Sequence, residues 1–346
     1  MSNDSLSWSI SPVKAIKYFL GLTALPLSFG AALAIAAVPA RADVWDMAIA
    51  YPAGNYQTKG AERFASEVKK ATAGAVSIVV QSGGALGFKG PEMLGAIEQG
   101  LVPLGSVLLS QQVGVEPLLG IGSLPFLVSG FDEMQIFTEI ARPTYEKLAA
   151  KHNQKILYII GWPGQHIFSK NPLVEVSDFR NMKIRTVDRS GSNFFRELGA
   201  SPAQMPWGEV VPALATGVIN SVSTSGSSAV DGQFWEFLNK CHLVYWQSNF
   251  DMVTVNLDAW KKLTPANQKT IEEIASKLEP EFLDAAKTED NEKLATLASR
   301  GVVQTRPSKE LLDYMISKAK PEWASFAQNT KGASEILDLY RARVRK

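Results

Sequence analysis

Cysteine and histidine are scarce in this chain of 346 residues. It has one cysteine, Cys241, and three histidines, at positions 152, 166 and 242. A single cysteine cannot form an internal disulfide or a cysteine-rich metal cluster, and we expect it to be buried and unreactive. The G-x-S-x-G and H-E-x-x-H motifs of hydrolases are also absent. The sequence therefore predicts binding without catalysis, metal or cofactor; a secreted hydrolase is the alternative from another class.

An excess of one charge is lacking as well. Lysine and arginine together number 35, and aspartate and glutamate 34, which gives a formal net charge of +1. A near-neutral chain offers no strongly basic surface for a polyanion. We therefore expect no nucleic-acid partner, and we expect the protein to be a monomer.

Apolar runs long enough to span a membrane are missing after the first 40 residues. Residues 18–38 are almost wholly apolar; Lys14 and Lys17 precede them, and Ala40-Arg41-Ala42 follows. This is the pattern of a signal peptide, with small residues at the two positions that a signal peptidase reads. We expect residues 1–42 to be cleaved and the protein to be periplasmic. An uncleaved membrane anchor is the alternative, because the run is long enough to span a bilayer.

The rest of the chain alternates between short apolar segments and amphipathic ones. Expected strands include 44–50, 76–80, 104–109, 155–161, 182–186 and 249–256, and expected helices include 59–72, 92–99, 132–152, 193–198 and 209–215. Such alternation predicts an α/β fold with mostly parallel sheets covered by helices on both faces. Residues 260–300 are charged and helix-prone, and we expect Pro265 and Pro280 to divide them into long connecting helices.

The length left after cleavage, 346 − 42 = 304 residues, favours two lobes over a single core. We expect lobe 1 at residues 43–160, with part of 253–300 returning to it. We expect lobe 2 at residues 161–252, with part of 300–346 packing on it.

A glycine-rich loop, Gly83-Gly84-Ala85-Leu86-Gly87, follows an expected strand and precedes an expected helix. A phosphate-binding loop is one interpretation. The G-x-G-x-x-G spacing is absent, however, and no Gly-Lys-Ser/Thr follows. We therefore expect a turn whose backbone needs positive φ.

Arg185 is the most informative single residue, because it ends a short apolar-alternating strand next to a turn at residues 188–191. A guanidinium stays charged and offers a planar fork that binds both oxygens of a carboxylate. A carboxylate in a closed, water-poor cleft needs such a partner, since burying it unpaired is costly. We expect Arg185 to be a carboxylate receptor; a surface arginine at a strand end is the alternative.

Several stretches of the sequence resemble the DctP family, the solute-binding proteins of TRAP (tripartite ATP-independent periplasmic) transporters. The resemblance covers most of the chain after residue 42, and its stretches are 60–65, 83–87, 124–126, Lys183-Ile184-Arg185, Met205-Pro206 with Glu209, Ala213-Leu214 with Gly217, and Asn256 before Trp260. It implies the two-lobed periplasmic binding protein fold, with crossing strands and a long connecting helix. It also implies that Arg185 binds the ligand carboxylate in the cleft and that the ligand passes to membrane permease subunits. A ligand-sensing co-receptor is an alternative role.

Two departures from the family pattern bear on the ligand. Where the family often has a second arginine, this chain has Gln165 or His166, which argues for a monocarboxylate rather than a dicarboxylate. Where relatives that bind sialic acid have an asparagine, this chain has 222–225, so the contact falls to Thr224 or Ser225.

Loops at strand ends are expected to line the cleft. Aromatic residues there would form a wall for an apolar or aromatic ligand body, although each of them is also a candidate for core packing. The expected ligand-binding residues, besides Arg185, Gln165, His166, Thr224 and Ser225, are Asn55, Tyr56, Trp162, Trp207, Phe250 and Asp251.

Glu209 has two interpretations. It could ligate a cation beside the ligand carboxylate, as in some relatives that bind keto acids. We favour a structural role, in which it caps its helix or supports Arg185.

Overall fold

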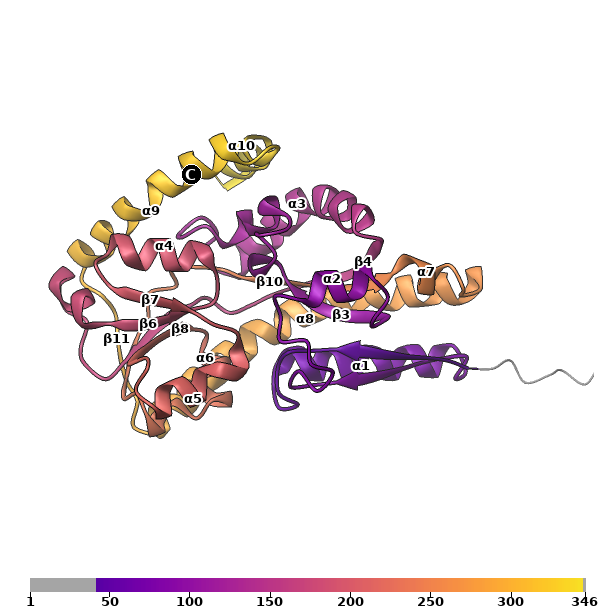
Figure 1. Cartoon of the computed structure of the whole chain (residues 1–346), viewed down its shortest axis with the longest axis horizontal. Helices are drawn as coiled ribbons and strands as arrows, with labels where there is room; N and C mark the ends of the chain where they lie inside the picture. The colour runs from indigo at the N-terminus through magenta and orange to yellow at the C-terminus, as the bar shows by residue number, and fades with distance from the viewer. Residues whose placement is uncertain (1–41, 345–346) are drawn as a thin grey trace, which may run out of the picture. The chain divides into compact units, whose positions relative to one another are not determined.

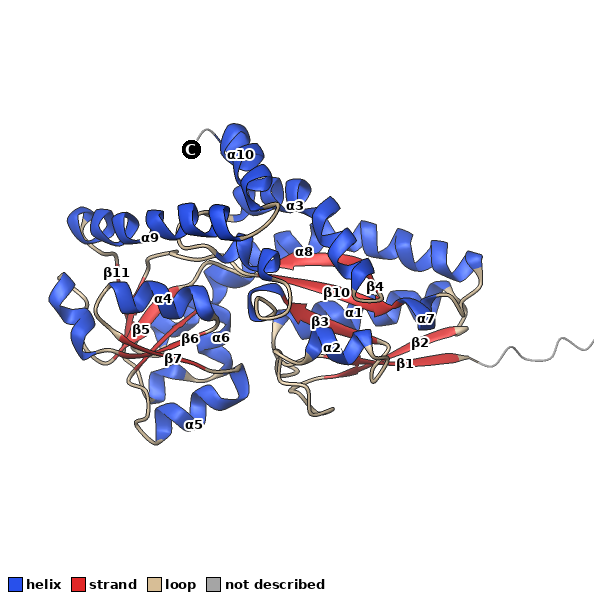
Figure 2. Ribbon diagram, turned by 45° about the horizontal axis from the view of Figure 1, so that its top comes forward, coloured by secondary structure: helices blue, strands red, loops and turns tan. Residues whose placement is uncertain are grey.

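Residues 42–344 are described in the computed structural model of the chain. They form two β-sheets with helices around them (Figure 1, Figure 2). We call the part built on the five-stranded sheet lobe 1 and the part built on the six-stranded sheet lobe 2. The expected signal peptide lies outside the described residues except for Ala42. No helix within residues 42–344 has the length and apolar character that crossing a membrane requires.

The sheet of lobe 1 has the strand order β2-β1-β3-β10-β4. Its strands are β1 (Asp43–Ala48), β2 (Val76–Gln81), β3 (Leu104–Leu108), β4 (Gln154–Gly161) and β10 (Phe250–Asn256). β1 is parallel to β2 and β3, but β10 is antiparallel to both of its neighbours. The sheet is mostly parallel, as predicted, and β10 is the exception, because this strand enters from lobe 2 and runs against β3 and β4.

The sheet of lobe 2 has the strand order β11-β9-β5-β8-β6-β7. Its strands are β5 (His166–Ser169), β6 (Lys183–Thr186), β7 (Ser201–Gln204), β8 (Ser221–Thr224), β9 (Lys240–His242) and β11 (Val303–Thr305). β6 is parallel to β7 and β8, whereas β5 is antiparallel to β8 and β9. This sheet is also mixed, and β6 places Arg185 between two parallel neighbours.

Two short segments carry the chain between the lobes. Residues 162–165 connect β4 to β5, and residues 243–249 connect β9 to β10. The two crossing segments hydrogen-bond to each other: Trp162 N donates to Asn249 O (2.8 Å), and Gln165 N donates to Gln247 O (3.0 Å). The first crossing begins next to the expected boundary at residue 160. The second ends at residue 249 rather than 252, so the expected boundary falls inside β10 and residues 250–252 belong to lobe 1.

The helices are α1 (Tyr56–Ala71), α2 (Met93–Glu98), α3 (Phe131–Lys151), α4 (Arg189–Glu197), α5 (Val210–Ala215), α6 (Gly226–Asp231), α7 (Leu257–Trp260), α8 (Pro265–Ser299), α9 (Lys309–Asn329) and α10 (Ala333–Val344). Short 3-10 turns occur at η1 (Leu109–Gln111), η2 (Pro117–Ser123), η3 (Val176–Asn181), η4 (Trp207–Glu209) and η5 (Phe234–Glu236). Local sequence explains where α1 begins: Asn55 precedes it and accepts a hydrogen bond from Gln57 N (2.9 Å), and Phe64 and Val68 are buried on one face.

α8 is a single helix of 35 residues that serves both lobes. Phe282 packs in the core of lobe 1, whereas Leu294 and Leu297 pack in the core of lobe 2. The prediction that Pro280 interrupts this region is wrong, because the helix runs through it. Pro265 stands in the first turn, where the missing N–H costs no helical hydrogen bond, and Thr264 caps that end. The long connecting helix implied by the family resemblance is present.

The last two helices divide between the lobes. Leu311, Met315 and Ala319 of α9 are buried in the core of lobe 2, as expected for part of residues 300–346. Leu337 and Tyr340 of α10 instead pack in the core of lobe 1, beside α3. The C-terminal region therefore covers both lobes.

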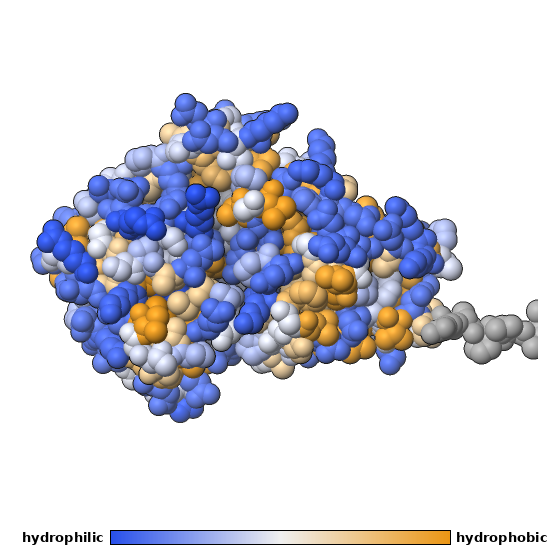
Figure 3. Space-filling view, viewed as in Figure 1, coloured by the Kyte–Doolittle hydropathy of each residue, from blue (hydrophilic) through white to orange (hydrophobic). Residues whose placement is uncertain are grey.

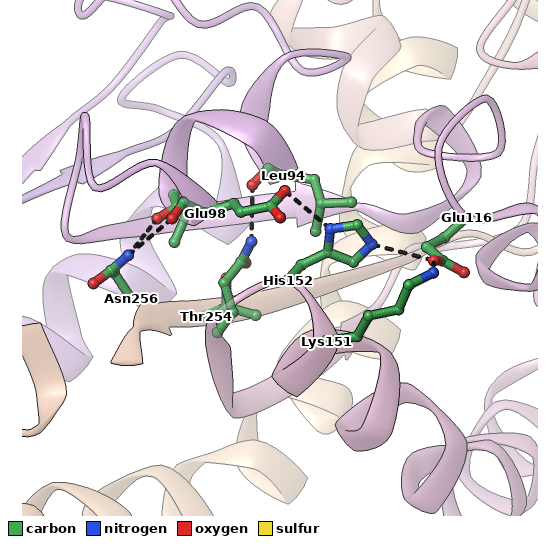
Figure 4. Close-up of polar contacts among 9 residues, drawn as sticks. Leu94, Glu98, Glu116, Lys151, His152, Thr254 and Asn256 are labelled. Carbon is green, nitrogen blue, oxygen red and sulfur yellow. Dashed lines mark hydrogen bonds and ion pairs between the residues drawn. The ribbon is translucent and has the colours of Figure 1, made fainter. Parts of the chain in front are cut away.

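A charged cluster fixes the C-terminal end of α3 within lobe 1 (Figure 4). His152 lies between two carboxylates: Nδ1 is 2.9 Å from Glu98 Oε2, and Nε2 is 3.2 Å from Glu116 Oε1. Lys151 pairs with the same Glu116. The cluster joins α2, the start of η2 and α3, so this histidine has a structural role.

Two smaller expectations agree with the structure. Cys241 is a free, buried thiol, and burial raises its pKa, which disfavours the reactive thiolate. Gly83, Gly84 and Gly87 all have positive φ, between 66° and 87°, so the glycine loop is a turn that needs these residues. Hydrophilic residues cover most of the face drawn in Figure 3, with hydrophobic residues in scattered groups.

Candidate functional site

A small pocket lies where the strands of the two lobes end. Its empty space measures about 470 Å³, part of which is open solvent. Both lobes and both crossing segments contribute to its lining. The lining residues are Ala50, Tyr51, Lys89, Leu108, Gln111, Trp162, Gln165, Arg185, Val187, Trp207, Thr224, Ser225, Ser228 and Asn249.

Strand direction explains why these residues meet. Tyr51 follows the end of β1, Leu108 ends β3, and Trp162 follows the end of β4. In lobe 2, Arg185 lies near the end of β6 and Thr224 ends β8. Ligands of α/β proteins bind outside the carboxyl ends of parallel strands, and the loops there are free to vary without disturbing the sheets.

Arg185 is buried and is held by backbone carbonyls on both sides. Its Nε and Nη2 donate to Met205 O at 3.1 and 3.0 Å, and its Nη1 lies 3.4 Å from Ser223 O. These bonds fix the side of the guanidinium and leave N–H donors of Nη1 and Nη2 for a ligand at its end. The expected receptor therefore lines the pocket with its fork already oriented.

The charge of Arg185 has no carboxylate partner in direct contact within residues 42–344. Carbonyl oxygens accept its hydrogen bonds but do not neutralise its charge. Burial lowers the pKa of Arg185 to about 10, and the nearby carboxylate of Asp188 opposes that effect. The guanidinium remains charged at neutral pH, so the pocket holds a desolvated cation that an anion would stabilise.

One side of the pocket is aromatic. The rings of Tyr51 and Trp162 meet edge to face, with centroids 4.8 Å apart. Tyr51 OH donates to both oxygens of Asp251 at 3.1 Å, Trp162 Nε1 donates to the same carboxylate, and Ser106 Oγ donates at 3.0 Å. Burial raises the pKa of Asp251 to about 6, while these hydrogen bonds oppose the rise. Because the polar atoms of both rings point to Asp251, the pocket is lined by their carbon surfaces.

The rim of the pocket carries an ion pair between the lobes. Lys89 Nζ of lobe 1 lies 3.6 Å from Glu209 Oε1 of lobe 2, and both side chains are more than half exposed. Glu209 makes no side-chain cap for α5 and no contact with Arg185. The prediction that Glu209 caps its helix or supports Arg185 is therefore wrong. Its side chain instead pairs with Lys89 across the rim of the pocket. Within residues 42–344, no three or more His, Cys, Asp or Glu side chains are placed so that they could hold a metal ion.

Of the residues expected to bind ligand, six line the pocket: Trp162, Gln165, Arg185, Trp207, Thr224 and Ser225. Ser225 also caps α6, where its Oγ accepts from Ser228 N at 3.3 Å. The stacked rings of Trp207 and Phe234 show that Trp207 also packs on the core of lobe 2.

The other five do not line it. Asn55 caps α1 and donates to Asp231 Oδ2 across the lobes at 2.6 Å. Tyr56 packs behind Trp162 and donates to Gly161 O, and Phe250 packs in the core of lobe 1 beside Phe137. Asp251 stands behind the aromatic side. Each of these four side chains instead makes contacts within the protein.

His166 is fully buried, and it too is absent from the lining. Its ring packs edge-on against Tyr245, with centroids 4.4 Å apart. Neither ring nitrogen has a hydrogen-bond partner among the described residues. Burial lowers the pKa of His166 to about 3, so this residue is neutral at physiological pH and cannot replace a second arginine.

Sequence reasoning did not single out eight of the lining residues, which are Ala50, Tyr51, Lys89, Leu108, Gln111, Val187, Ser228 and Asn249. Tyr51 directly follows the expected strand 44–50, and Asn249 is the first residue of the expected strand 249–256. The signal that could have found these two is position: each is within three residues of a strand end, as Trp162 is. Residue type alone pointed instead to their neighbours Tyr56, Phe250 and Asp251.

Comparisons with known proteins agree with this architecture. The profile of the DctP family, described as bacterial extracellular solute-binding protein, family 7, matches residues 47–329. A solute-binding protein of Albidiferax ferrireducens is 24% identical over 298 residues, which cover 83% of this chain and 86% of that protein.

Solved structures are similar as well. DctP7 of Bordetella pertussis, an extracytoplasmic solute receptor binding pyroglutamic acid, is 30% identical with a TM-score of 0.84, covering 87% of this chain and 100% of that one. A solute-binding protein of a TRAP transporter from a marine metagenome, specific for pyroglutamate, is 27% identical with a TM-score of 0.83, covering 87% and 99%. The two-lobed α/β fold expected from the sequence is thereby confirmed.

Proposed function

Because the chain belongs to the DctP family of extracellular solute-binding proteins, which are receptors and not enzymes, we propose that it binds a monocarboxylate with a neutral body. Arg185 would hold the carboxylate, and the protein would deliver the ligand to the permease subunits of a TRAP transporter. Residues 1–42 would direct export to the periplasm and be removed there.

The observation that carries the proposal is the state of Arg185. A buried guanidinium with no carboxylate in contact, held in place by Met205 and Ser223 and open to the pocket at its end, is suited to bind an anion. Both oxygens of a carboxylate can meet such a fork at once. Binding would give the guanidinium the counter-charge that the protein does not supply in direct contact.

The charges around the pocket favour one carboxylate rather than two. His166 is neutral, and Lys89 is exposed and paired with Glu209. A second ligand carboxylate would therefore meet no buried cation. The ring surfaces of Tyr51 and Trp162 instead offer an apolar wall for the rest of the ligand. Pyroglutamate, which the two similar receptors bind, is a monocarboxylate with a neutral ring and a suitable first probe.

Calorimetry on the purified protein tests this proposal. The panel has pyroglutamate and cyclopentanecarboxylate as monocarboxylates, succinate and malate as dicarboxylates, and cyclopentanecarboxamide as a matched neutral control. We expect a monocarboxylate to bind and to raise the melting temperature, which the carboxamide should not do. Tighter binding of the dicarboxylates would overturn the proposal. Recovery of the bound acid unchanged after incubation would support a receptor, whereas turnover would contradict it.

The export proposal has a separate test. Expression of the full chain in a Gram-negative host, followed by N-terminal sequencing of the periplasmic protein, should give Asp43 as the first residue. Retention of residues 1–42 on membrane-bound protein would overturn the proposed cleavage without affecting the binding proposal.

A further inference from the structure

Asn249 lines the pocket and has a buried hydrogen-bond acceptor that no group in the described part of the chain uses. This residue lines the pocket and is only 2% exposed, yet its side-chain oxygen Oδ1 has no hydrogen-bond partner among the described residues. Its backbone oxygen is already used by Trp162 N at 2.8 Å. A buried acceptor without a donor is costly, and native proteins seldom keep one without a function.

A chain of hydrogen bonds fixes the orientation of the Asn249 amide. Gln247 Nε2 donates to Ser123 O at 2.7 Å and to the carboxylate of Asp188 at 3.2 Å. A carbonyl only accepts, so this end of Gln247 must be the nitrogen and Oε1 must be the other end. Oε1 accepts from Asn249 Nδ2 at 3.2 Å. Asn249 must therefore turn its nitrogen to Gln247 and its oxygen away from it.

Gln165, on the adjacent crossing segment, has the opposite amide orientation: its oxygen bonds within the protein, whereas in Asn249 the nitrogen does. Trp246 Nε1 donates to Ser223 Oγ at 2.9 Å, and the hydroxyl of Ser223 in turn donates to Gln165 Oε1 at 3.1 Å. Gln165 also lines the pocket, and the oxygen end of its amide is the end that bonds to Ser223, so Nε2 is turned away from that bond. It is thus a donor held in place, beside an acceptor held in place.

The side-chain amides of Gln165 and Asn249 belong to the two crossing segments, which lie next to each other. Gln165 N donates to Gln247 O, and Trp162 N donates to Asn249 O, so the segments that carry them run side by side. We infer that Asn249 Oδ1 and Gln165 Nε2 form an amide-recognising pair, which selects acids that carry an N–H donor and a carbonyl acceptor. The ligand class is a carboxylate with a neutral amide, either as a lactam ring or as an open carbamoyl group.

This inference rests on the proposed function, because Arg185 must first hold the carboxylate. It goes further in assigning the neutral part of the ligand. Tyr51 and Trp162 have no free O–H or N–H donor for that part, since both donate to Asp251. The crossing segments supply hydrogen bonds in its place, and their two amides match the two faces of a ligand amide.

Three probes of nearly equal shape separate the contributions. Pyroglutamate has the carboxylate, the ring N–H and the ring carbonyl. The lactone 5-oxotetrahydrofuran-2-carboxylate replaces the N–H by an oxygen, and cyclopentanecarboxylate has neither group. Calorimetry on the wild-type protein should rank them in that order. The lactam should bind roughly ten- to a hundredfold more tightly than the lactone, because the lactone leaves Asn249 Oδ1 without a donor.

Two variants assign the effect to the residues. Asn249→Leu should bring the affinities of lactam and lactone to within about threefold of each other. Gln165→Leu should reduce the difference between lactone and cyclopentanecarboxylate in the same way. Asn171→Leu makes the same chemical change on the exposed surface of lobe 2 and should keep the wild-type ranking. Melting temperatures show that each variant is folded, and the wild-type ranking decides the matter if one is not.

The outcomes separate the two proposals. Equal binding of lactam and lactone to the wild type overturns the inference and leaves the carboxylate receptor intact. If cyclopentanecarboxylate binds and pyroglutamate does not, the inference is also overturned and the carboxylate receptor is left intact. Failure of all three acids to bind, together with failure of the dicarboxylates, sinks both proposals. An unchanged ranking in Asn249→Leu shows that another residue selects the N–H and overturns the assignment.

Discussion

The two sides of the pocket use polar residues in opposite ways. On the aromatic side, formed by Tyr51 and Trp162, each polar atom donates to the carboxylate of Asp251 behind it. On the polar side, formed by Arg185, Thr224 and Ser225, the guanidinium is backed by neutral carbonyls. A carboxylate that accepts from an O–H or N–H group uses up that donor. A carbonyl that accepts from a guanidinium orients it but leaves its charge available to a ligand.

This comparison indicates that the hydrogen-bond partner of a side chain inside the protein determines what that side chain can offer to a ligand in the pocket. A tyrosine and a tryptophan become apolar walls because their O–H and N–H groups are already used. Arginine remains a receptor because its backing is neutral. Four substitutions test this comparison, in order of expected effect.

The largest effect is expected at Arg185. Arg185→Ala should reduce ligand affinity by roughly 3–5 kcal/mol, the scale for removing one member of a buried ion pair. Arg185→Lys should restore only part of it, because an ammonium lacks the fork. Removal also leaves Met205 O and Ser223 O without their donor, so the free protein should lose some stability yet remain folded. Calorimetry on folded variants checks this; affinity near that of wild type would make Arg185 structural only.

Asp251, which accepts hydrogen bonds from both aromatic residues of the pocket, should make the stability of the protein depend on pH. Burial raises the pKa of Asp251 to about 6 from its ordinary value near 3.8. Between these values the folded protein holds a proton that the unfolded chain has released, so this carboxyl contributes less to the free energy of unfolding as pH rises. Relative to Asp251→Asn, which cannot titrate there, the wild type should lose up to ~3 kcal/mol from about pH 4 to about pH 7. Urea denaturation of both proteins across that range measures it; a constant difference would contradict a raised pKa.

Asn55 tests whether contacts between the lobes matter as well as the pocket lining. Asn55→Ala removes both the cap of α1 and the hydrogen bond to Asp231. We expect a loss of roughly 1–2 kcal/mol in the free energy of unfolding and a further loss of affinity. Ser308→Ala, which removes the cap of α9 without an interlobe contact, should lower stability and leave affinity unchanged. Equal effects of both variants on affinity would remove any role for the Asn55–Asp231 bond.

The smallest effect is expected at Lys89, which is a cation at the pocket but is exposed and paired with Glu209. Exposed ion pairs contribute about 1 kcal/mol or less and weaken with salt. Lys89→Gln should therefore reduce affinity about threefold or less in calorimetry at moderate ionic strength. A loss as large as that of Arg185→Ala would identify Lys89 as a second carboxylate receptor and favour a dicarboxylate ligand.

Much of the architecture follows from local sequence. The alternation of apolar segments places most strands and helices within a few residues of their observed bounds, and Asn55 and Thr264 cap helices as their residue types favour. Arg185 is recognisable because its type and its position at a strand end both fit an anion site. These features depend on neighbours in sequence, so periodicity and capping chemistry are sufficient to predict them.

Tertiary structure decided the rest. Only the folded chain places β10 antiparallel between β3 and β4, and only it directs the O–H of Tyr51 to Asp251, 200 residues away. The orientation of Asn249 likewise depends on Gln247, and through it on Ser123 and Asp188. Whether a polar atom faces a ligand or the protein interior is set by hydrogen bonds between residues distant in sequence. No local pattern contains that information, because the partners meet only when the lobes and their crossing segments have formed.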